Sequence, residues 1–246
     1  MSDIEVQDDA GVRIIRFNRP KKRNALNIHM YQQLTEYLIE GEADNKINAF
    51  LLCGSHQCFT SGNDIADFLE HTNLNSNHPT VRFLFFLLEL KKPIVAAVSG
   101  PAIGIGTTLL LHCDLIYADM TAKFQLPFVD LSLVPEAGSS LLLPQLIGHP
   151  KAAELLLLGD PFDAKTALDL KLINDIIDEQ KLENYALEKA KRLARKPAEA
   201  LQLTRQLMRK NKHKLQHQMY MELEHFEKQL NSEDAKKHFK SFLKAK

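Results

Sequence analysis

The 246-residue sequence predicts an α/β fold. Short runs of apolar, mostly β-branched residues occur at 12–17, 49–53, 93–98 and 115–118. Turn-forming residues bound these runs, as is typical of strands buried in a sheet. Apolar segments with helical spacing, such as residues 81–90, lie between them. Strands that alternate with helices favour crossover connections in an α/β protein over a β-sandwich.

A change in composition divides the chain into two regions. Residues 1–195 hold all ten glycines and the alternating pattern, so we expect one core domain there. A last β-like run at 172–177 interrupts a mostly helical stretch of this region. Residues 196–246 contain no glycine and are rich in Lys, Gln, Glu, Leu and Met, which predicts a separate amphipathic helical region.

Charge and cysteine content narrow the class of protein. Lys plus Arg and Asp plus Glu number 31 each, so the net charge of +0 gives no long-range attraction to nucleic acid or to an anionic membrane. Three cysteines cannot all pair, which indicates a reducing compartment. The acidic N-terminus lacks the apolar core of a signal peptide, and the chain does not end in Ser-Lys-Leu. We therefore expect a cytoplasmic, bacterial protein.

Three glycines and a proline fall within residues 100–106, between a predicted strand and a predicted helix. Glycine lets the backbone approach a ligand, and free N–H groups at a helix start favour negative charge. The Gly-x-Gly-x-x-Gly spacing of dinucleotide-binding loops is absent. A tight turn that packs a helix on a sheet would also explain the segment, so both interpretations stay open.

Two further segments place polar groups in turns. Residues 58–65 gather small polar side chains around Gly62, which suits either backbone donors or a plain turn with Asp64 as a helix cap. Glu136 lies between Pro135 and Ala137 in apolar surroundings, so it is a candidate for a raised pKa and acid–base chemistry. Alternatively, Glu136 stands in the first turn of a helix, where negative charge is favoured anyway.

Two groups of basic residues are weaker candidates. The run 21–23, Lys-Lys-Arg, is either a solvated surface or a local phosphate contact. His213 and His217 stand four residues apart on a predicted helix, a spacing that suits a metal ion. No carboxylate lies between them and lysines crowd that face, so we expect a surface helix and no metal site.

Taken together and in this order, the segments resemble the crotonase (enoyl-CoA hydratase/isomerase) superfamily over nearly the whole chain. The motifs that carry the resemblance are Asn18-Arg19-Pro20-x-x-x-Asn24-Ala25-Leu26-Asn27, Phe59-x-Ser61-Gly62-Asn63-Asp64, Gly100-Pro101-Ala102-x-Gly104-Ile105-Gly106, Cys113-Asp114-Leu115-Ile116-Tyr117-Ala118, Phe124-x-x-Pro127, Pro135-Glu136-Ala137-Gly138-Ser139-Ser140 and Leu157-Leu158-Gly159-Asp160-Pro161-Phe162-Asp163-Ala164.

The resemblance implies a crotonase-like spiral of β-β-α turns with a C-terminal helical trimerisation region, in a homotrimer or a dimer of trimers. The substrate would be an acyl-CoA thioester; CoA is part of that substrate, and no cofactor is bound permanently. The backbone N–H groups of Asn63 and Ile105 would bind the thioester oxygen. Contacts to CoA are expected from Lys22, Arg23, Ala25, Leu26, Ser61, Asn63, Asp64, Ile65 and Gly104.

Departures from the family's hydratases sharpen the expected reaction. Those enzymes use two glutamates to add water, and the matching positions hold Thr108 and Phe128. Hydration needs a base for water and an acid for carbon, so this loss counts against it. Glu136 then remains as the acid–base residue, in a segment similar to that of the Δ3,Δ2-enoyl-CoA isomerase branch, and Leu126, Phe128 and Val134 would exclude water. The alternatives are a hydratase or other crotonase-type reaction, and a non-catalytic acyl-CoA-binding protein.

Overall fold

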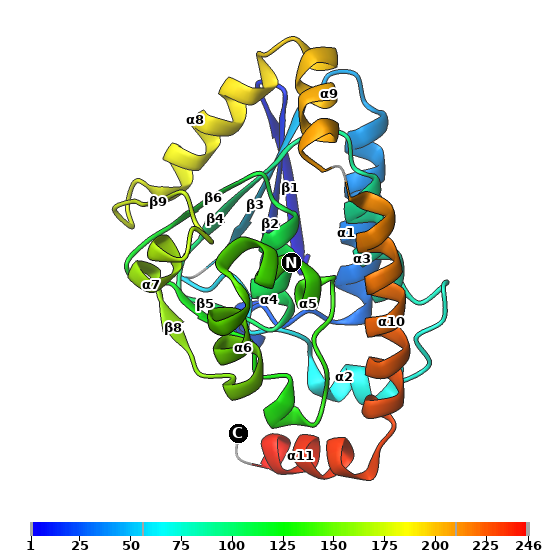
Figure 1. The fold of residues 1–246 in the computed structure, drawn as a ribbon. Coiled ribbons are helices and arrows are strands. Elements are labelled where there is room, and N and C mark those ends of the chain that lie inside the picture. The colour runs from blue at the N-terminus through cyan, green and yellow to red at the C-terminus, as the bar shows by residue number, and fades with distance from the viewer. Residues whose placement is uncertain (1, 56, 210, 245–246) are drawn as a thin grey trace.

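The computed structural model describes residues 2–55, 57–209 and 211–244. A six-stranded sheet crosses the molecule in the order β1-β2-β3-β4-β6-β9 (Figure 1). β1 pairs antiparallel with β2, and the other neighbouring strands pair in parallel. The strands are β1 (Ile4–Asp9), β2 (Val12–Phe17), β3 (Ala49–Gly54), β4 (Ile94–Val98), β6 (Leu115–Ala118) and β9 (Asp175–Ile176).

The four central strands coincide with the four predicted β-runs, so the predicted α/β class is confirmed. Their residues are buried almost throughout, because helices cover both faces of a parallel sheet. The β-like run at 172–177 yields only the two-residue strand β9. β1 was not predicted, because this edge strand is mostly polar and exposes much of one face to solvent.

A smaller sheet of three strands lies beside the large one, in the order β5-β7-β8. Its strands are β5 (Pro101–Ile103), β7 (Lys123–Gln125) and β8 (Phe162–Asp163). Twice the chain passes from the large sheet to the small sheet and then to a helix: β4-β5-α4 and β6-β7-α5. This repeated β-β-α turn is the predicted spiral, and part of the glycine-rich segment therefore forms a strand.

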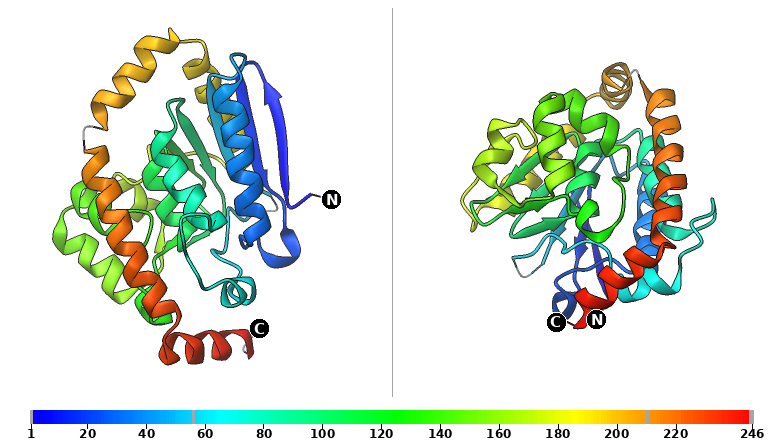
Figure 2. Two further views of the ribbon diagram at one scale, coloured as in Figure 1. Left: turned by 90° about the vertical axis from the view of Figure 1, so that its right-hand side faces the viewer. Right: turned by 60° about the horizontal axis from the view of Figure 1, so that its bottom comes forward.

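Helices cover the two faces of the large sheet. α8 (Leu182–Ala194) packs its small buried residues Ala186 and Ala190 against one face. α1 (Ile28–Ala43) and α3 (Pro79–Glu89) pack against each other on the other side, as Figure 2 also shows. The Asn27 side chain caps α1 by accepting a 2.8 Å hydrogen bond from the Met30 N–H.

The remaining helices before residue 196 are short. They are η1 (Pro20–Lys22), α2 (Ile65–Glu70), α4 (Ile105–Thr108), η2 (Leu109–His112), η3 (Val129–Leu131), α5 (Ser139–Ile147), α6 (His149–Leu158) and α7 (Ala164–Asp169).

Three helices follow residue 196: α9 (Ala198–Met208), α10 (Lys212–Leu230) and α11 (Glu233–Lys244). α10 runs along the outside of α3 and α5, and α11 crosses the end of the molecule next to α2 (Figures 1 and 2). Phe226 and Phe239 anchor these helices with exposed fractions of 4% and 2%. No helix in the described part of the chain is both long and apolar enough to cross a bilayer.

Candidate active site

Glu136 lies in a turn between η3 and α5, three residues before the helix begins at Ser139. Ala137 and Gly138 both have positive φ, at 58° and 74°. The Glu136 carbonyl accepts hydrogen bonds from the Ser139 N–H at 3.1 Å and the Ser139 hydroxyl at 2.7 Å. Glu136 is therefore held in a strained turn that precedes α5. The alternative prediction, that Glu136 stands in the first turn of a helix, is wrong.

Glu136 is only 8% exposed and lines a small, partly open cavity of about 30 Å³. The cavity is lined by Asn63, Phe68, Leu74, Thr80, Val81, Leu84, Phe85, Glu136, Ala137, Met219, Glu222, Leu223 and Phe226. Leu126, Phe128 and Val134, which we expected to exclude water, are not part of this lining. Apolar side chains of α2, α3 and α10 exclude water instead, because these helices close over Glu136.

Burial raises the pKa of Glu136 to about 8. The Thr108 hydroxyl donates a hydrogen bond to the carboxylate, which lowers the pKa and partly offsets burial. The negative charge of Glu222 raises it further. A carboxyl group poised near neutral pH can both accept and return a proton, which is what acid–base catalysis needs.

Two backbone segments run side by side next to this cavity. The Thr60 N–H donates to the Pro101 carbonyl at 2.9 Å, and the Ile103 N–H donates to the Thr60 carbonyl at 3.0 Å. Within the described ranges, neither the Asn63 nor the Ile105 backbone N–H has a hydrogen-bond partner. The structure thus brings the two predicted oxyanion-hole segments together and leaves both donors available.

Glycine is needed where these segments meet. A Cβ atom at position 106 would lie 2.7 Å from the Thr60 side chain, which is too close for a non-bonded contact. Gly104 has a φ of 56°, in the region that glycine adopts without a steric penalty. The interpretation of residues 100–106 as a tight turn is therefore confirmed, and the same turn leaves the Ile105 N–H free. Contact of this N–H with a ligand stays a prediction.

Tyr31 of α1 contacts the backbone segment that contains Asn63. Its hydroxyl donates a 2.5 Å hydrogen bond to Oδ1 of Asn63. Burial raises the pKa of Tyr31 well above its usual value, and the nearby Glu136 carboxylate adds to this. Tyr31 therefore stays protonated and fixes the Asn63 side chain, a contact that no sequence motif indicated.

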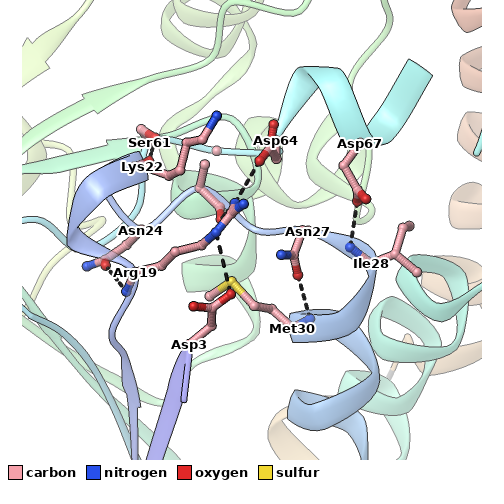
Figure 3. Close-up of polar contacts among 12 residues, drawn as sticks. Asp3, Arg19, Lys22, Asn24, Asn27, Ile28, Met30, Ser61, Asp64 and Asp67 are labelled. Atoms are coloured by element: carbon pink, nitrogen blue, oxygen red, sulfur yellow. Dashed lines mark hydrogen bonds and ion pairs between the residues drawn. The ribbon is translucent and has the colours of Figure 1, made fainter. Parts of the chain in front are cut away.

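Most of the residues predicted to contact CoA come from two segments that pair with each other, residues 22–26 and 61–65. Figure 3 shows Lys22, Ser61 and Asp64 of these segments. The Leu26 N–H donates to the Gly62 carbonyl and the Asp64 N–H donates to the Leu26 carbonyl, each at 2.8 Å. This pairing places Ala25, Leu26, Ser61, Asn63 and Asp64 together, with Ile65 opening α2.

The charged side chains of these two segments and of the neighbouring Arg19 make different contacts. Arg19 donates to Asp64 at 2.7 Å and to the Ala25 carbonyl at 3.0 Å, so the Asp64 carboxylate is an ion-pair partner and does not cap α2 (Figure 3). Lys22 and Arg23 are exposed at the edge, where their charges can meet an anion. Their contact with CoA stays a prediction, as does that of Gly104.

A larger hollow, of about 970 Å³, lies elsewhere. It opens beside α8, between Arg16 and Glu183, which form an ion pair across it. None of the predicted catalytic or CoA-binding residues lines it. No carboxylate in its lining is buried as Glu136 is, so we place the candidate site at Glu136.

Glu222 of α10 is a second carboxylate in the same cavity, and the sequence analysis missed it. Only 5% of Glu222 is exposed, and burial raises its pKa. A signal existed: Met219, Glu222, Phe226 and Leu230 are spaced as the buried face of one helix, so an acid stands where an apolar residue is expected. Among the described residues, no group of His, Cys, Asp and Glu has a metal-binding arrangement.

Comparisons with known proteins agree with this geometry. The model of the enoyl-CoA hydratase/isomerase family matches residues 7–246. Enoyl-CoA delta isomerase 2 of Rattus norvegicus is 34% identical over 85% of this chain, which spans only about half (54%) of that relative's length. 2,3-Dehydroadipyl-CoA hydratase of Escherichia coli is 32% identical over 86% of this chain and 83% of its own.

A solved structure titled Pseudomonas aeruginosa OdaA superposes with a TM-score of 0.95 at 40% identity, covering 99% of both chains. An enoyl-CoA hydratase/isomerase from Pseudoalteromonas atlantica gives a TM-score of 0.94 at 37% identity over 100% of this chain and 98% of that one. The spiral fold, the paired backbone segments and these matches, which cover nearly the whole chain, all point to the same family. This protein therefore belongs to the enoyl-CoA hydratase/isomerase family of the crotonase superfamily.

Proposed function

We propose that this protein is a Δ3,Δ2-enoyl-CoA isomerase, which shifts the double bond of a 3-enoyl-CoA to the 2-trans position in fatty acid β-oxidation. The observation that carries the proposal is the environment of Glu136. Its carboxyl group is buried beside Thr108, which occupies a position where the family's hydratases have a glutamate. The other such position holds Phe128, which is buried and lies outside the cavity lining. The similarity to relatives named delta isomerases supports the same reaction.

The reaction needs one group that first takes and then returns a proton. Ionised Glu136 removes a proton from C2 of the 3-enoyl-CoA, and the C–H electron pair moves into a conjugated dienolate. Protonated Glu136 then delivers that proton to C4, which leaves the 2-trans double bond and regenerates the carboxylate. A pKa near 8 suits both halves of this cycle, because neither form of the carboxyl group is strongly favoured near neutral pH.

The negative charge of the dienolate gathers on the thioester oxygen. The free backbone N–H groups of Asn63 and Ile105 are the donors for that oxygen. A preorganised donor of this kind is worth about 2.7–4 kcal/mol of transition-state stabilisation. The apolar side chains of Phe68, Leu84 and Met219 keep water out, which disfavours hydration of the product.

The CoA moiety would lie along the surface formed by residues 22–26 and 61–65. The exposed cations Lys22 and Arg23 would contact its phosphates, and the backbone of Ala25 and Leu26 would hold the adenine end. The cavity beside Glu136 has a volume of only about 30 Å³, so an acyl chain would have to displace side chains of α2, α3 or α10 to enter it.

Hydration is the second candidate, because 2,3-dehydroadipyl-CoA hydratase is a relative at a similar identity. Glu222 does not supply the missing hydratase acid, because its oxygens already accept hydrogen bonds from Gly138 and Ser140. Measuring product formation from 3-hexenoyl-CoA, a longer 3-enoyl-CoA and crotonyl-CoA separates the candidates. We expect rapid isomerisation of the 3-enoyl substrates. Fast hydration of crotonyl-CoA would overturn the proposal, and tight CoA binding without turnover would indicate a non-catalytic binding protein.

Isomerase activity should depend on pH through Glu136. The base must be ionised, so kcat/KM should rise with pH and level off above the pKa of about 8. Two pH units below that pKa the expected loss is about 100-fold. A glutamate with the ordinary pKa of 4.5 would instead give a flat profile from pH 6 to 9. Measuring kcat/KM for 3-hexenoyl-CoA over that range distinguishes the two.

We also propose that the chain assembles as a homotrimer or a dimer of trimers. Large apolar side chains on α9 and α10 are exposed in the single chain, which is unusual for a surface that meets only water. They are Leu203, Leu207, Met208, Tyr220 and Met221. Light scattering coupled to size-exclusion chromatography should give three or six times the chain mass of 27.9 kDa. A monomer mass at micromolar concentration would contradict this.

A further inference from the structure

Glu222 holds the turn that carries Glu136. Its Oε2 accepts a 2.6 Å hydrogen bond from the Gly138 N–H, and its Oε1 accepts a 3.0 Å bond from the Ser140 N–H. The Ser140 hydroxyl also donates to Oε1 and accepts a 3.0 Å bond from the Gln218 side chain. One side chain of α10 thus satisfies two N–H groups at the start of α5, two and four residues after Glu136.

The turn is held from the opposite side as well. His112 Nε2 lies 2.7 Å from the Ala137 carbonyl. Burial lowers the pKa of His112 to about 4, so the ring is neutral at physiological pH and donates through Nε2. Ala137 lies between these two contacts with a φ of 58°, a conformation that alanine rarely adopts. A strained conformation persists only where the surrounding structure holds it, and the hydrogen bonds to Glu222 are part of what holds this turn.

We propose that Glu222, from the C-terminal helical region, is a positioning residue for Glu136, so that α10 forms part of the catalytic site of its own subunit. The expected kinetic effects rest on the proposed function. The hydrogen bonds between Glu222 and the turn do not depend on it. Losing the Glu222 acceptors would leave a buried N–H group at Gly138 and a partly buried one at Ser140 without partners, and the turn could relax. A displacement of about 1 Å at a reacting group can cost about 100-fold in rate.

The charge of Glu222 has a second effect, because it raises the pKa of Glu136. The Thr108 and Tyr31 hydroxyls also lie near Glu136, and the uncharged side chains of Asn63 and Thr80 line the same cavity. Of the helices packed against α10, α5 carries no charged residue, and the charged residues of α3, Arg82 and Glu89, are exposed. The described charged side chains of α11, all within residues 233–240, are exposed or half-buried. They follow the C-terminal end of α10. Glu222 is therefore the charge that acts on Glu136 from this side.

Two replacements separate geometry from charge. Glu222→Leu removes both acceptor oxygens, and we expect kcat for 3-hexenoyl-CoA to fall about 10- to 100-fold with KM changed less than about 3-fold. Glu222→Gln keeps one acceptor oxygen and removes the charge, so it should restore most of the lost kcat and move the pH profile to lower pH. Glu224→Gln makes the same charge change at an exposed position of α10 and should match the wild type.

A readout independent of turnover completes the test. The carboxyl C=O band of Glu136, assigned by its loss in Glu136→Gln, can be titrated by infrared difference spectroscopy. We expect its midpoint to shift to lower pH in Glu222→Gln and to stay in place in Glu224→Gln. An unshifted midpoint, or a folded Glu222→Leu protein with wild-type kcat, would overturn the inference. If the wild type isomerises no 3-enoyl-CoA while the midpoint still shifts, the proposed function fails and the positioning role stands.

Discussion

Glu136→Gln is expected to abolish the double-bond shift, lowering kcat by about 10²–10⁴-fold. The amide has nearly the shape of the carboxyl group and can still accept the hydrogen bond from Thr108, but it cannot take a proton from C2. Binding of CoA should persist, because the predicted contacts at residues 22–26 and 61–65 are untouched. Single-turnover assays with 3-hexenoyl-CoA and calorimetric titration with CoA measure the two effects separately.

The same replacement should stabilise the folded protein. A loss of activity in Glu136→Gln could then not be attributed to unfolding. Folding raises the pKa of Glu136 from 4.5 to about 8, so the wild type loses stability as pH rises through that window. Glutamine does not titrate, and its advantage should reach roughly 2–4 kcal/mol by pH 7. Glu36→Gln, on the exposed face of α1, is the matched control and should change neither property. Near-normal isomerase rates in Glu136→Gln would remove Glu136 from the mechanism.

Arg205→Met is expected to destabilise the protein by about 3–5 kcal/mol, because it breaks a buried ion pair. Arg205 of α9 is 6% exposed, and its Nε lies 2.8 Å from both carboxylate oxygens of Asp114. It also donates to the Leu90 carbonyl. Without Arg205, Asp114 loses its ion-pair partner just before β6, and the nearby charge of Arg209 compensates it only in part. Denaturant unfolding followed by circular dichroism gives the change in the free energy of unfolding.

A second replacement tests whether the buried charge causes that loss. Asp114 also accepts a 2.8 Å hydrogen bond from the Ile94 N–H, which an asparagine oxygen can take over. The double variant Arg205→Met, Asp114→Asn should therefore recover at least half of the lost stability. If the single variant unfolds within about 0.5 kcal/mol of the wild type, α9 is not anchored through this pair.

The sequence predicted elements whose signals are local. The central strands are nearly continuous apolar runs because both faces of a parallel sheet are covered. β1 was not predicted, because an edge strand needs few apolar residues. The sequence also located the Pro-Glu-Ala-Gly turn, but not its conformation, because the positive φ of Ala137 is set by distant contacts.

The sequence by itself determined the family, the two glycine-containing segments and Glu136 as the acid–base candidate. Only the tertiary structure decided what surrounds Glu136, because its neighbours Tyr31, Thr108 and Glu222 come from α1, α4 and α10. The raised pKa follows from burial, and burial depends on packing across the whole chain. Tertiary structure likewise made Glu222 a partner of the Glu136 turn, since a carboxylate 86 positions away has no local signal beyond its place on an apolar helix face.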